Sequence, residues 1–116
     1  MNDNVIYTLS KKFALRIVKL YNYLCEQKKE YVLSKQIYRS GTSIGANLAE
    51  SIYAQSEADY INKLKIALKE ASESKYWIEL LYEAELISQS EFDSLTNDIN
   101  IIIGTLVNII NKLLKK

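Results

Sequence analysis

Three glutamates have side chains suited to chemistry, because carboxylates bind metals and act as acids and bases. Glu50, Glu70 and Glu73 lie in segments expected to be helical, where Arg39 and Lys63 are also found. Dimetal sites in helical bundles combine such glutamates with Glu-x-x-His pairs, and the chain contains no His. The two basic residues also balance the carboxylates without a metal. We therefore expect structural ion pairs that fix helix register, and no metal site.

The stretch RSGTSIGANLAES, residues 39–51, is a second candidate because it is rich in glycine and small residues. A phosphate-binding P-loop needs Gly, four residues and then Gly-Lys-Ser/Thr after a strand. Here Gly45 is followed by Ala46 and not by lysine, and no apolar strand precedes it. On a helix, Gly41 and Gly45 lie one turn apart on the same face. The stretch therefore predicts a small-residue seam at which another helix packs closely.

No pair of residues suggests an enzyme. Without His, the chain lacks the side chain most used for acid–base work near neutral pH and for binding transition metals. Helical ribonucleases with an Arg-x-x-x-x-His motif are excluded for the same reason. Cys25 lies on the apolar side of its segment and is expected to be a small core residue. We expect no enzymatic activity, no cofactor and no small-molecule substrate.

The sequence carries no targeting or membrane signal. The N-terminal MNDNVIYTLS has no basic segment followed by an apolar core. The most apolar stretch, INIIIGTLVNIINKLL at 99–114, is interrupted by Asn and is shorter than the roughly 20 apolar residues of a membrane span. The single cysteine fits a reducing compartment. We expect a soluble, cytoplasmic protein.

The pattern of apolar residues predicts four long helices. The 116 residues include only 3 Gly and no Pro, so turns are few. Apolar residues recur at three- and four-residue steps, and Ser10, Ser34, Ser56 and Ser88 are suitable N-caps. The expected helices span about 10–27, 35–54, 56–84 and 89–115. Short connectors between amphipathic helices predict an all-α, up-down-up-down antiparallel four-helix bundle in one domain, residues 1–116.

A turn at about residue 55 determines which residues of the second and third helices lie level with each other. In an antiparallel pair, residues whose numbers sum to about 111 share a height. Two polar clusters should therefore lie between these helices: Arg39 with Glu70 or Glu73, and Glu50 with Lys63 near Asn47.

The fourth helix is apolar over more of its circumference than a four-helix core requires. One stripe faces the expected core, and a second stripe beside it consists of Ile103, Val107, Ile110 and Leu114. A helix with so wide an apolar surface is either deeply buried or meets a partner chain. We expect the second stripe to form an oligomer interface. The alternative is a broad face packed against both neighbouring helices of one small bundle.

The segments KQIYRSGTSIGANLAES and AQSEADYINKLKIALKEASESKYWIELL carry a family signature. They resemble the four-helix bundle proteins encoded in intervening sequences of 23S ribosomal RNA genes, over about residues 10–115. The resemblance implies a homopentameric ring with no known enzymatic activity. That family is similar to the accessory variability protein of diversity-generating retroelements, a basic pentamer that works with a reverse transcriptase and binds nucleic acid. RNA or a nucleic-acid-processing enzyme is therefore an implied partner.

Charge bears on that partner through its distribution, because a formal net charge of +1 gives little general attraction to nucleic acid. Residues 1–40 carry 8 basic and 3 acidic residues, whereas residues 41–100 carry 4 and 11. In the up-down topology we expect a basic rim at one end of the bundle, suited to RNA. This rim contains Lys11, Lys12, Arg16, Lys63, Lys65, Lys112, Lys115 and Lys116. The alternative is ordinary solvated lysines on a structural or protein-interaction module with no nucleic-acid role.

Aromatic residues are the other feature that bears on nucleic acid. The nine Tyr and Trp77 have rings that can stack on single-stranded bases. Because Tyr60 lies on an apolar heptad stripe and Trp77 lies one turn from Glu73, we expect core or subunit contacts instead.

Overall fold

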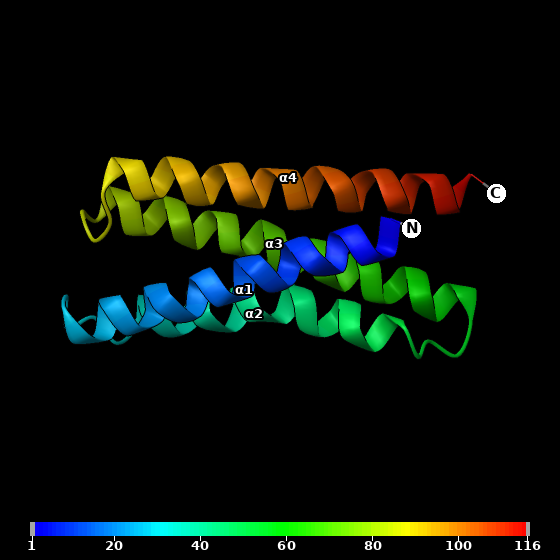
Figure 1. Ribbon diagram of the computed structural model, residues 1–116, viewed down its shortest axis with the longest axis horizontal. Helices are drawn as coiled ribbons and strands as arrows, with labels where there is room; N and C mark the ends of the chain where they lie inside the picture. The colour runs from blue at the N-terminus through cyan, green and yellow to red at the C-terminus, as the bar shows by residue number, and fades with distance from the viewer. Residues whose placement is uncertain (1, 116) are drawn as a thin grey trace.

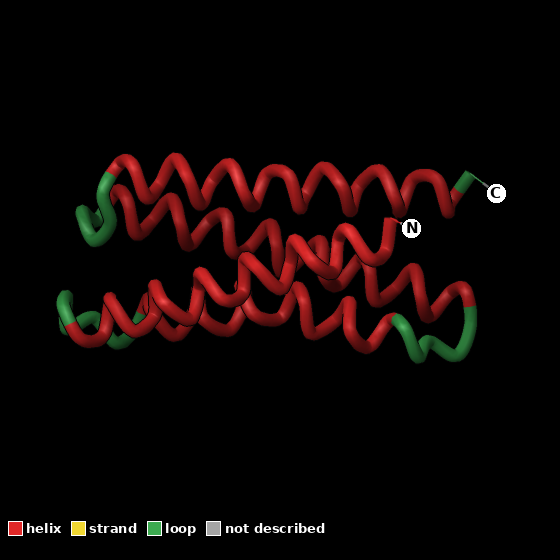
Figure 2. Tube along the Cα trace, in the orientation of Figure 1, coloured by secondary structure: helices red, strands yellow, loops and turns green. Residues whose placement is uncertain are grey.

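Four helices run alternately in opposite directions along the 47 Å long axis of the protein (Figure 1). The computed structural model describes residues 2–115, and the side chains of residues 5–115. The helices are α1 (Asn2–Glu26), α2 (Leu33–Ser51), α3 (Glu57–Glu83) and α4 (Gln89–Leu114). Within the described residues there is no strand, and short turns join the helices at the two ends (Figure 2). The expected all-α, up-down-up-down four-helix bundle is confirmed.

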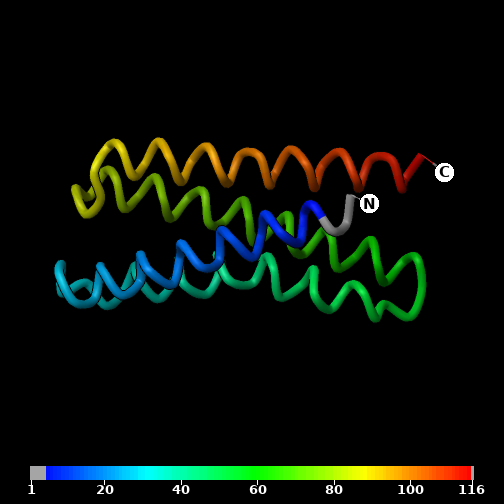
Figure 3. The backbone as a smooth tube through the Cα atoms, in the orientation of Figure 1, coloured from blue at the N-terminus to red at the C-terminus, as the bar shows by residue number. Residues whose placement is uncertain are grey.

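The helices do not close evenly around the core. α2 packs extensively against both α1 and α3, and α3 packs against α4. Of the four neighbouring pairs, α1 and α4 have the fewest contacts, and the two helices diverge toward the end of α1 (Figure 3). The bundle is therefore most open between the second half of α1 and the first half of α4.

α1 begins at Asn2, about two turns before the expected start at Ser10. Ser10 resembles an N-cap in the sequence, yet it is 0% exposed and lies inside the helix. Ile6 is also buried and continues the stripe that contains Phe13 and Ile17. The prediction was wrong because burial of this apolar stripe outweighs the local preference of serine for a helix end.

α3 and α4 begin at the N-cap serines that the sequence predicts, Ser56 and Ser88. Ser56 Oγ accepts a hydrogen bond from the backbone N–H of Asp59 at 3.0 Å, and Ser88 Oγ accepts one from Glu91 at 3.1 Å. Each serine thereby satisfies one of the N–H groups that the first turn of a helix leaves unpaired. Both helices also begin with acidic residues, which interact favourably with the positive end of the helix dipole.

α2 begins differently from the expectation. It starts at Leu33, and its cap is the carboxylate of Glu30, not the hydroxyl of Ser34. Glu30 accepts hydrogen bonds from the backbone N–H groups of Val32, Leu33 and Ser34 at 3.1, 2.9 and 2.7 Å. Burial alone would raise the pKa of Glu30, but these donors bond to its charged form and lower the pKa below its ordinary value.

The glycines of α2 face α1. A Cβ atom at residue 41 would lie 2.8 Å from Ile17 Cγ1, whereas one at residue 45 would have ordinary contact with Ser10 O at 3.7 Å. The Ile17 side chain therefore fills the space over Gly41, where a Cβ atom does not fit without a shift. On the other side of α2, the Ser40 hydroxyl and the Ser74 hydroxyl of α3 form a hydrogen bond at 2.9 Å. Small residues on α2 thus hold it between two helices.

Candidate functional site

A polar cluster joins α2 to α3 around Arg39. The Arg39 guanidinium pairs with Glu70 at 3.3 Å and with Glu73, and it also donates to Gln36 Oε1 at 3.3 Å. Trp77 Nε1 donates to the same Glu73 oxygen at 2.8 Å. The structure thus brings together Arg39, Glu70 and Glu73, as the antiparallel alignment of the two helices predicts. Trp77 also belongs to the cluster.

The environment of Glu73 makes it a structural anion. The hydrogen bond from Trp77 lowers the pKa of Glu73; burial opposes this shift, and the Arg39 guanidinium adds to it. A carboxylate with a lowered pKa is a poor proton acceptor at neutral pH. The cluster therefore joins α2 to α3 through charged side chains and fixes the register of the two helices.

The second expected pair lies near the α2–α3 turn. Lys63 Nζ donates to Glu50 Oε1 at 2.8 Å, and this hydrogen bond and the charge of Glu50 raise the pKa of Lys63. Asn47 does not take part in this cluster, because its amide donates to the backbone oxygen of Ser43 at 2.8 Å on its own helix. An open depression of about 480 Å³ beside the pair is lined by Tyr53 and other polar residues of the turn.

Arg16, which the sequence assigned to the basic rim, forms a network with α4 instead. From α1 it donates to Glu91, Asp98 and Ser94 on α4, at 2.8, 2.7 and 2.9 Å. It thereby bridges the side of the bundle where the two helices have the fewest backbone contacts. Because α1 starts earlier than expected, Arg16 lies level with the first half of α4 and is not a free cation of a basic rim.

A cavity of about 490 Å³ lies beside this network, between α1 and the start of α4. Leu20, Ile87 and Leu95 supply buried apolar groups at its base, and Arg16 and Glu91 lie at its polar side. A smaller cavity of about 90 Å³ continues along the same side, next to Lys12. Arg16 is already neutralised by two carboxylates. The larger cavity is therefore an open part of the bundle, with the paired Arg16 at its polar side and the exposed Lys19 at its edge.

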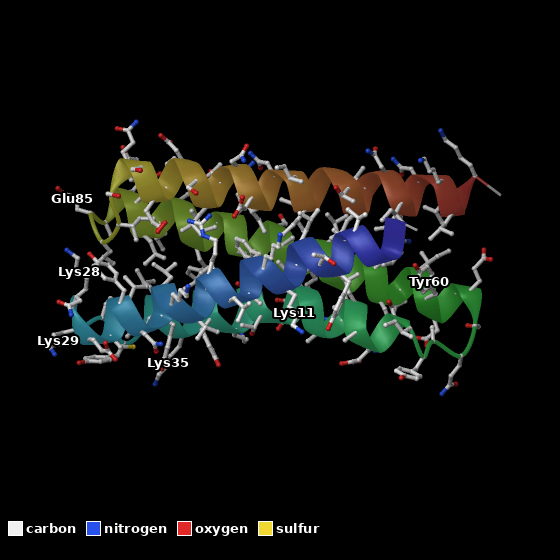
Figure 4. All side chains as sticks on the ribbon, in the orientation of Figure 1. Lys11, Lys28, Lys29, Lys35, Tyr60 and Glu85 are labelled. Atoms are coloured by element: carbon white, nitrogen blue, oxygen red, sulfur yellow. The ribbon has the colours of Figure 1, made fainter. Side chains whose placement is uncertain are left out.

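The expected basic rim is not formed as one surface, which corrects the sequence-based expectation. Arg16 and Lys63 are held in ion pairs, and Lys11 lies midway along the bundle (Figure 4). Lys12 is level with Asp98 and Ile101, about 16 Å along the axis from Lys112 at 1.5 Å per residue. Exposed lysines of the expected rim are Lys11, Lys12, Lys65, Lys112 and Lys115. Lys116 lies outside the described residues.

The expected oligomer stripe on α4 divides in two. Ile110 is buried at 5% exposure and Ile103 packs partly buried against the core, so these two serve the subunit itself. Val107 and Leu114 are exposed, at 36% and 56%. The prediction that Ile110 lies in an oligomer interface is wrong. Part of the broad apolar surface of α4 packs against neighbouring helices of the same subunit, and Ile110 belongs to that part. The surface that stays exposed is rotated from the predicted stripe.

We define the outer face of α4 by the exposed uncharged residues of its last five turns, beside which Lys112 is also exposed. They are Asn97, Asn100, Ile101, Gly104, Val107, Asn108, Asn111 and Leu114. Residues 99–111 contain no Asp, Glu, Lys or Arg. Ile101 is 46% exposed, and nothing lies within 4 Å of a Cβ built on Gly104. Sequence reasoning missed Ile101 and Gly104, although the regular spacing of the asparagines indicates the outward side.

The described residues contain no group of three His, Cys, Asp or Glu side chains that could hold a metal ion. Among the same residues, no helix combines the length and the apolar character needed to cross a membrane. Cys25 is half-buried, with Sγ 3.8 Å from Ser34 Oγ. The polar clusters that exist are ion pairs between helices, so the surfaces left for function are exposed helix faces and turns.

The comparisons with known proteins agree with this fold. The chain matches the model of a family described as 23S rRNA-intervening sequence protein over residues 2–108. It is similar to the solved structure of a protein of unknown function from the S23 ribosomal protein family of Bacteroides thetaiotaomicron. The two are 54% identical over 96% of this chain and 99% of that chain, with a TM-score of 0.94. No curated protein matches the chain. The family match covers α1 to α3 and most of α4, and the chain therefore belongs to the 23S rRNA-intervening sequence protein family.

Proposed function

We propose that this protein is a non-enzymatic, homo-oligomeric helical bundle that acts by binding in the cytoplasm. A homopentamer is the subunit number that the family resemblance implies. RNA or a nucleic-acid-processing protein is the expected partner, consistent with the similarity of the family to the retroelement accessory protein. The alternative is a structural or protein-interaction module that has no nucleic-acid role.

The observation that supports self-association is the uncharged outer face of α4. A solvent-facing helix surface normally carries charged residues opposite its apolar stripe. Here apolar Ile101 and Val107 alternate with asparagines over four turns, without a charged residue from 99 to 111. An apolar surface of this kind, rimmed by polar groups, is typical of a protein–protein contact.

A second copy of the same chain is the partner that fits this face best. An asparagine amide both donates and accepts hydrogen bonds, so a face rich in asparagine can pair with a copy of itself. Gly104 leaves the α4 backbone open, because nothing outside the nearby backbone of its own helix lies within 4 Å of its Cβ position. A helix of another subunit can therefore approach closely there. Because the face carries no charge, its partner needs no complementary charge, and an identical face on a second copy meets this condition.

Light scattering after size-exclusion chromatography tests this proposal. We expect the wild type to elute at a multiple of its 13.4 kDa chain mass, with five subunits as the family expectation. The double variant Ile101→Glu/Val107→Glu should run as a monomer, because charges placed on the face would be desolvated without partners in the interface. Its helical circular dichroism should be unchanged, because both side chains are exposed.

Ile52→Glu is the matched control. Ile52 is also an exposed apolar side chain, at 71%, but it lies at the α2–α3 turn, away from α4. This variant should keep the wild-type mass. A monomeric wild type, or a double variant that assembles like the control, would contradict self-association through α4. Absorbance at 260 nm in the same run reports co-purifying nucleic acid and separates the favoured partner from the alternative.

A further inference from the structure

The turn between α1 and α2 gathers exposed lysines at one end of the bundle. Lys28, Lys29 and Lys35 are all exposed and lie together at that end (Figure 4). The ion pairs of the described side chains involve Arg16, Arg39 and Lys63, so these three lysines keep their charges free. Lys28 Nζ lies 6.0 Å from the ring of Tyr23, which is a weak cation–π distance.

Exposed tyrosine rings lie among these lysines. Tyr31 and Tyr38 are 52% and 41% exposed. Lys35 and Tyr38 lie three residues apart on α2, which makes them neighbours on one helix face, and Tyr31 lies in the turn that leads into this helix. The Tyr38 ring is supported from behind by Tyr21 of α1, with ring centroids 4.7 Å apart. The Tyr38 ring is therefore held in place while its outer surface remains accessible, and the Tyr31 ring is exposed in the turn.

The nearest carboxylate does not neutralise the lysines. Glu30 lies in the middle of the turn, but its two oxygens accept three backbone N–H groups of the α2 start. That arrangement directs the carboxylate toward the helix and fixes the turn that carries the lysines. Glu26, exposed at the end of α1, is the other acidic residue on the α1–α2 side, where the three lysines outnumber it. The remaining acidic residues at this end lie on α3, on the α3–α4 turn, where Figure 4 labels Glu85, and at the start of α4. A polyanion would therefore contact the α1–α2 side and avoid the α3–α4 side.

We propose that the α1–α2 turn is a binding site for single-stranded nucleic acid, formed by Lys28, Lys29, Lys35, Tyr31 and Tyr38. Lysines contact the phosphates, and the tyrosine rings stack on unpaired bases, which is the usual combination in sites for single strands. A duplex presents its phosphates but hides its bases, so it uses only the lysines. The inference rests on the proposed function in one respect, since three lysines per subunit bind weakly and assembly repeats the site along one strand.

Fluorescence anisotropy with a labelled single-stranded oligouridylate, and with an RNA duplex of the same length, tests the site. We expect the triple variant Lys28→Gln/Lys29→Gln/Lys35→Gln to bind the single strand at least about tenfold more weakly. Its salt dependence should fall by about 2 in slope, for three phosphate contacts at about 0.7 each. The variant Tyr31→Leu/Tyr38→Leu should lose about tenfold for the single strand and little for the duplex, because only unpaired bases stack.

The control removes the same charge elsewhere. Lys65→Gln/Lys112→Gln/Lys115→Gln also neutralises three exposed lysines, taken from the originally expected rim, and should retain affinity within about twofold. Equal loss in both triple variants, equal preference for duplex and single strand, or no binding by the wild type would overturn the proposal. The mass of each variant is measured in parallel. If the wild type is an oligomer that does not bind RNA, this site is overturned and self-association is not. If the wild type is a monomer whose RNA binding is lost only in the turn variants, self-association is overturned and this site is not.

Discussion

Gly41 on α2 lies directly against Ile17 on α1, so that a Cβ atom at residue 41 would be 2.8 Å from Ile17 Cγ1 and 3.3 Å from Ile17 Cβ. Ile17 is β-branched and fully buried, and it cannot swing away without disturbing the core. We predict that Gly41→Ala lowers the free energy of unfolding by about 1 kcal/mol. The overpacking cost of about 1–3 kcal/mol exceeds the gain of about 1 kcal/mol in helix propensity. Urea unfolding followed by circular dichroism measures the change.

Gly45→Ala is the matched comparison for this prediction. A Cβ there would have its nearest neighbour at 3.7 Å, which is ordinary contact. The alanine should therefore raise the free energy of unfolding by up to about 1 kcal/mol through helix propensity alone. Opposite signs for two substitutions one turn apart are the expected result. A shift in the same direction for both would show that the α1–α2 seam is looser than described.

The Arg16 network should stabilise the open side of the bundle. Arg16→Met keeps much of the side-chain length and removes the pairs with Glu91 and Asp98. These groups are about a third or more exposed, so we expect a loss of only about 1–2 kcal/mol in the free energy of unfolding. The difference from wild type should shrink in 1 M salt, because exposed charges are screened. Thermal and urea unfolding at two salt concentrations give the values.

Lys19→Met is the control for Arg16, because Lys19 is exposed on the same helix and lines the same cavity without an ion pair in the described part of the chain. It should change stability by less than about 0.5 kcal/mol. If Arg16→Met were equally mild, the three hydrogen bonds to α4 would not hold the helices together.

The Glu30 cap makes stability depend on acid. Its pKa is lowered in the folded state, so the unfolded state binds the proton more readily and stability falls as the pH drops. The contribution is complete above the ordinary glutamate range, about 4.3, and is lost as the pH falls through the lower folded value. Glu30→Gln should lower the free energy of unfolding by about 1 kcal/mol at pH 7 and by much less near pH 2.

Unfolding of Glu30→Gln, Glu26→Gln and wild type across this pH range tests the cap. Glu26 is exposed at the end of α1 and has no hydrogen bond among those of the described side chains. Its substitution should leave the acid dependence close to that of wild type. Parallel curves for Glu30→Gln and wild type would mean that the cap carries no charge-dependent stabilisation.

Local and periodic features of the fold could be read from the sequence. The apolar periodicity along the chain and the short connectors predicted four antiparallel helices, and Ser56 and Ser88 marked two starts because a capping serine acts on its own first turn. The level of Arg39 with Glu70 and Glu73 followed from one turn and the constant rise of a helix. These inferences needed no knowledge of distant packing.

The remaining features depend on contacts between distant parts of the chain. Ser10 has the local character of a cap, and only its burial beside α2 shows that it lies inside α1. Arg16 reaches α4 across 75 residues or more, and nothing near it in the sequence indicates Glu91 or Asp98. The outer face of α4 is set by how the helix is rotated about its axis. The broad apolar pattern did not show whether Ile103 or Ile101 faces outward, and the structure shows that Ile101 does.

The buried hydroxyl pair between α2 and α3 gives a prediction about coupling. Ser40 and Ser74 are both 0% exposed, and the Ser74 hydroxyl lies 2.9 Å from Ser40 Oγ and 2.9 Å from the Glu70 carbonyl. Ser74→Ala leaves the Ser40 hydroxyl buried without this partner and should lower the free energy of unfolding by about 1–2 kcal/mol. Ser40→Ala should be milder, because Ser74 retains the Glu70 carbonyl. The double variant should be no less stable than Ser74→Ala alone, since the second substitution removes the unpaired group. A double-mutant cycle in urea should therefore give a coupling energy of about 1 kcal/mol, and strictly additive losses would show that the two hydroxyls do not depend on each other.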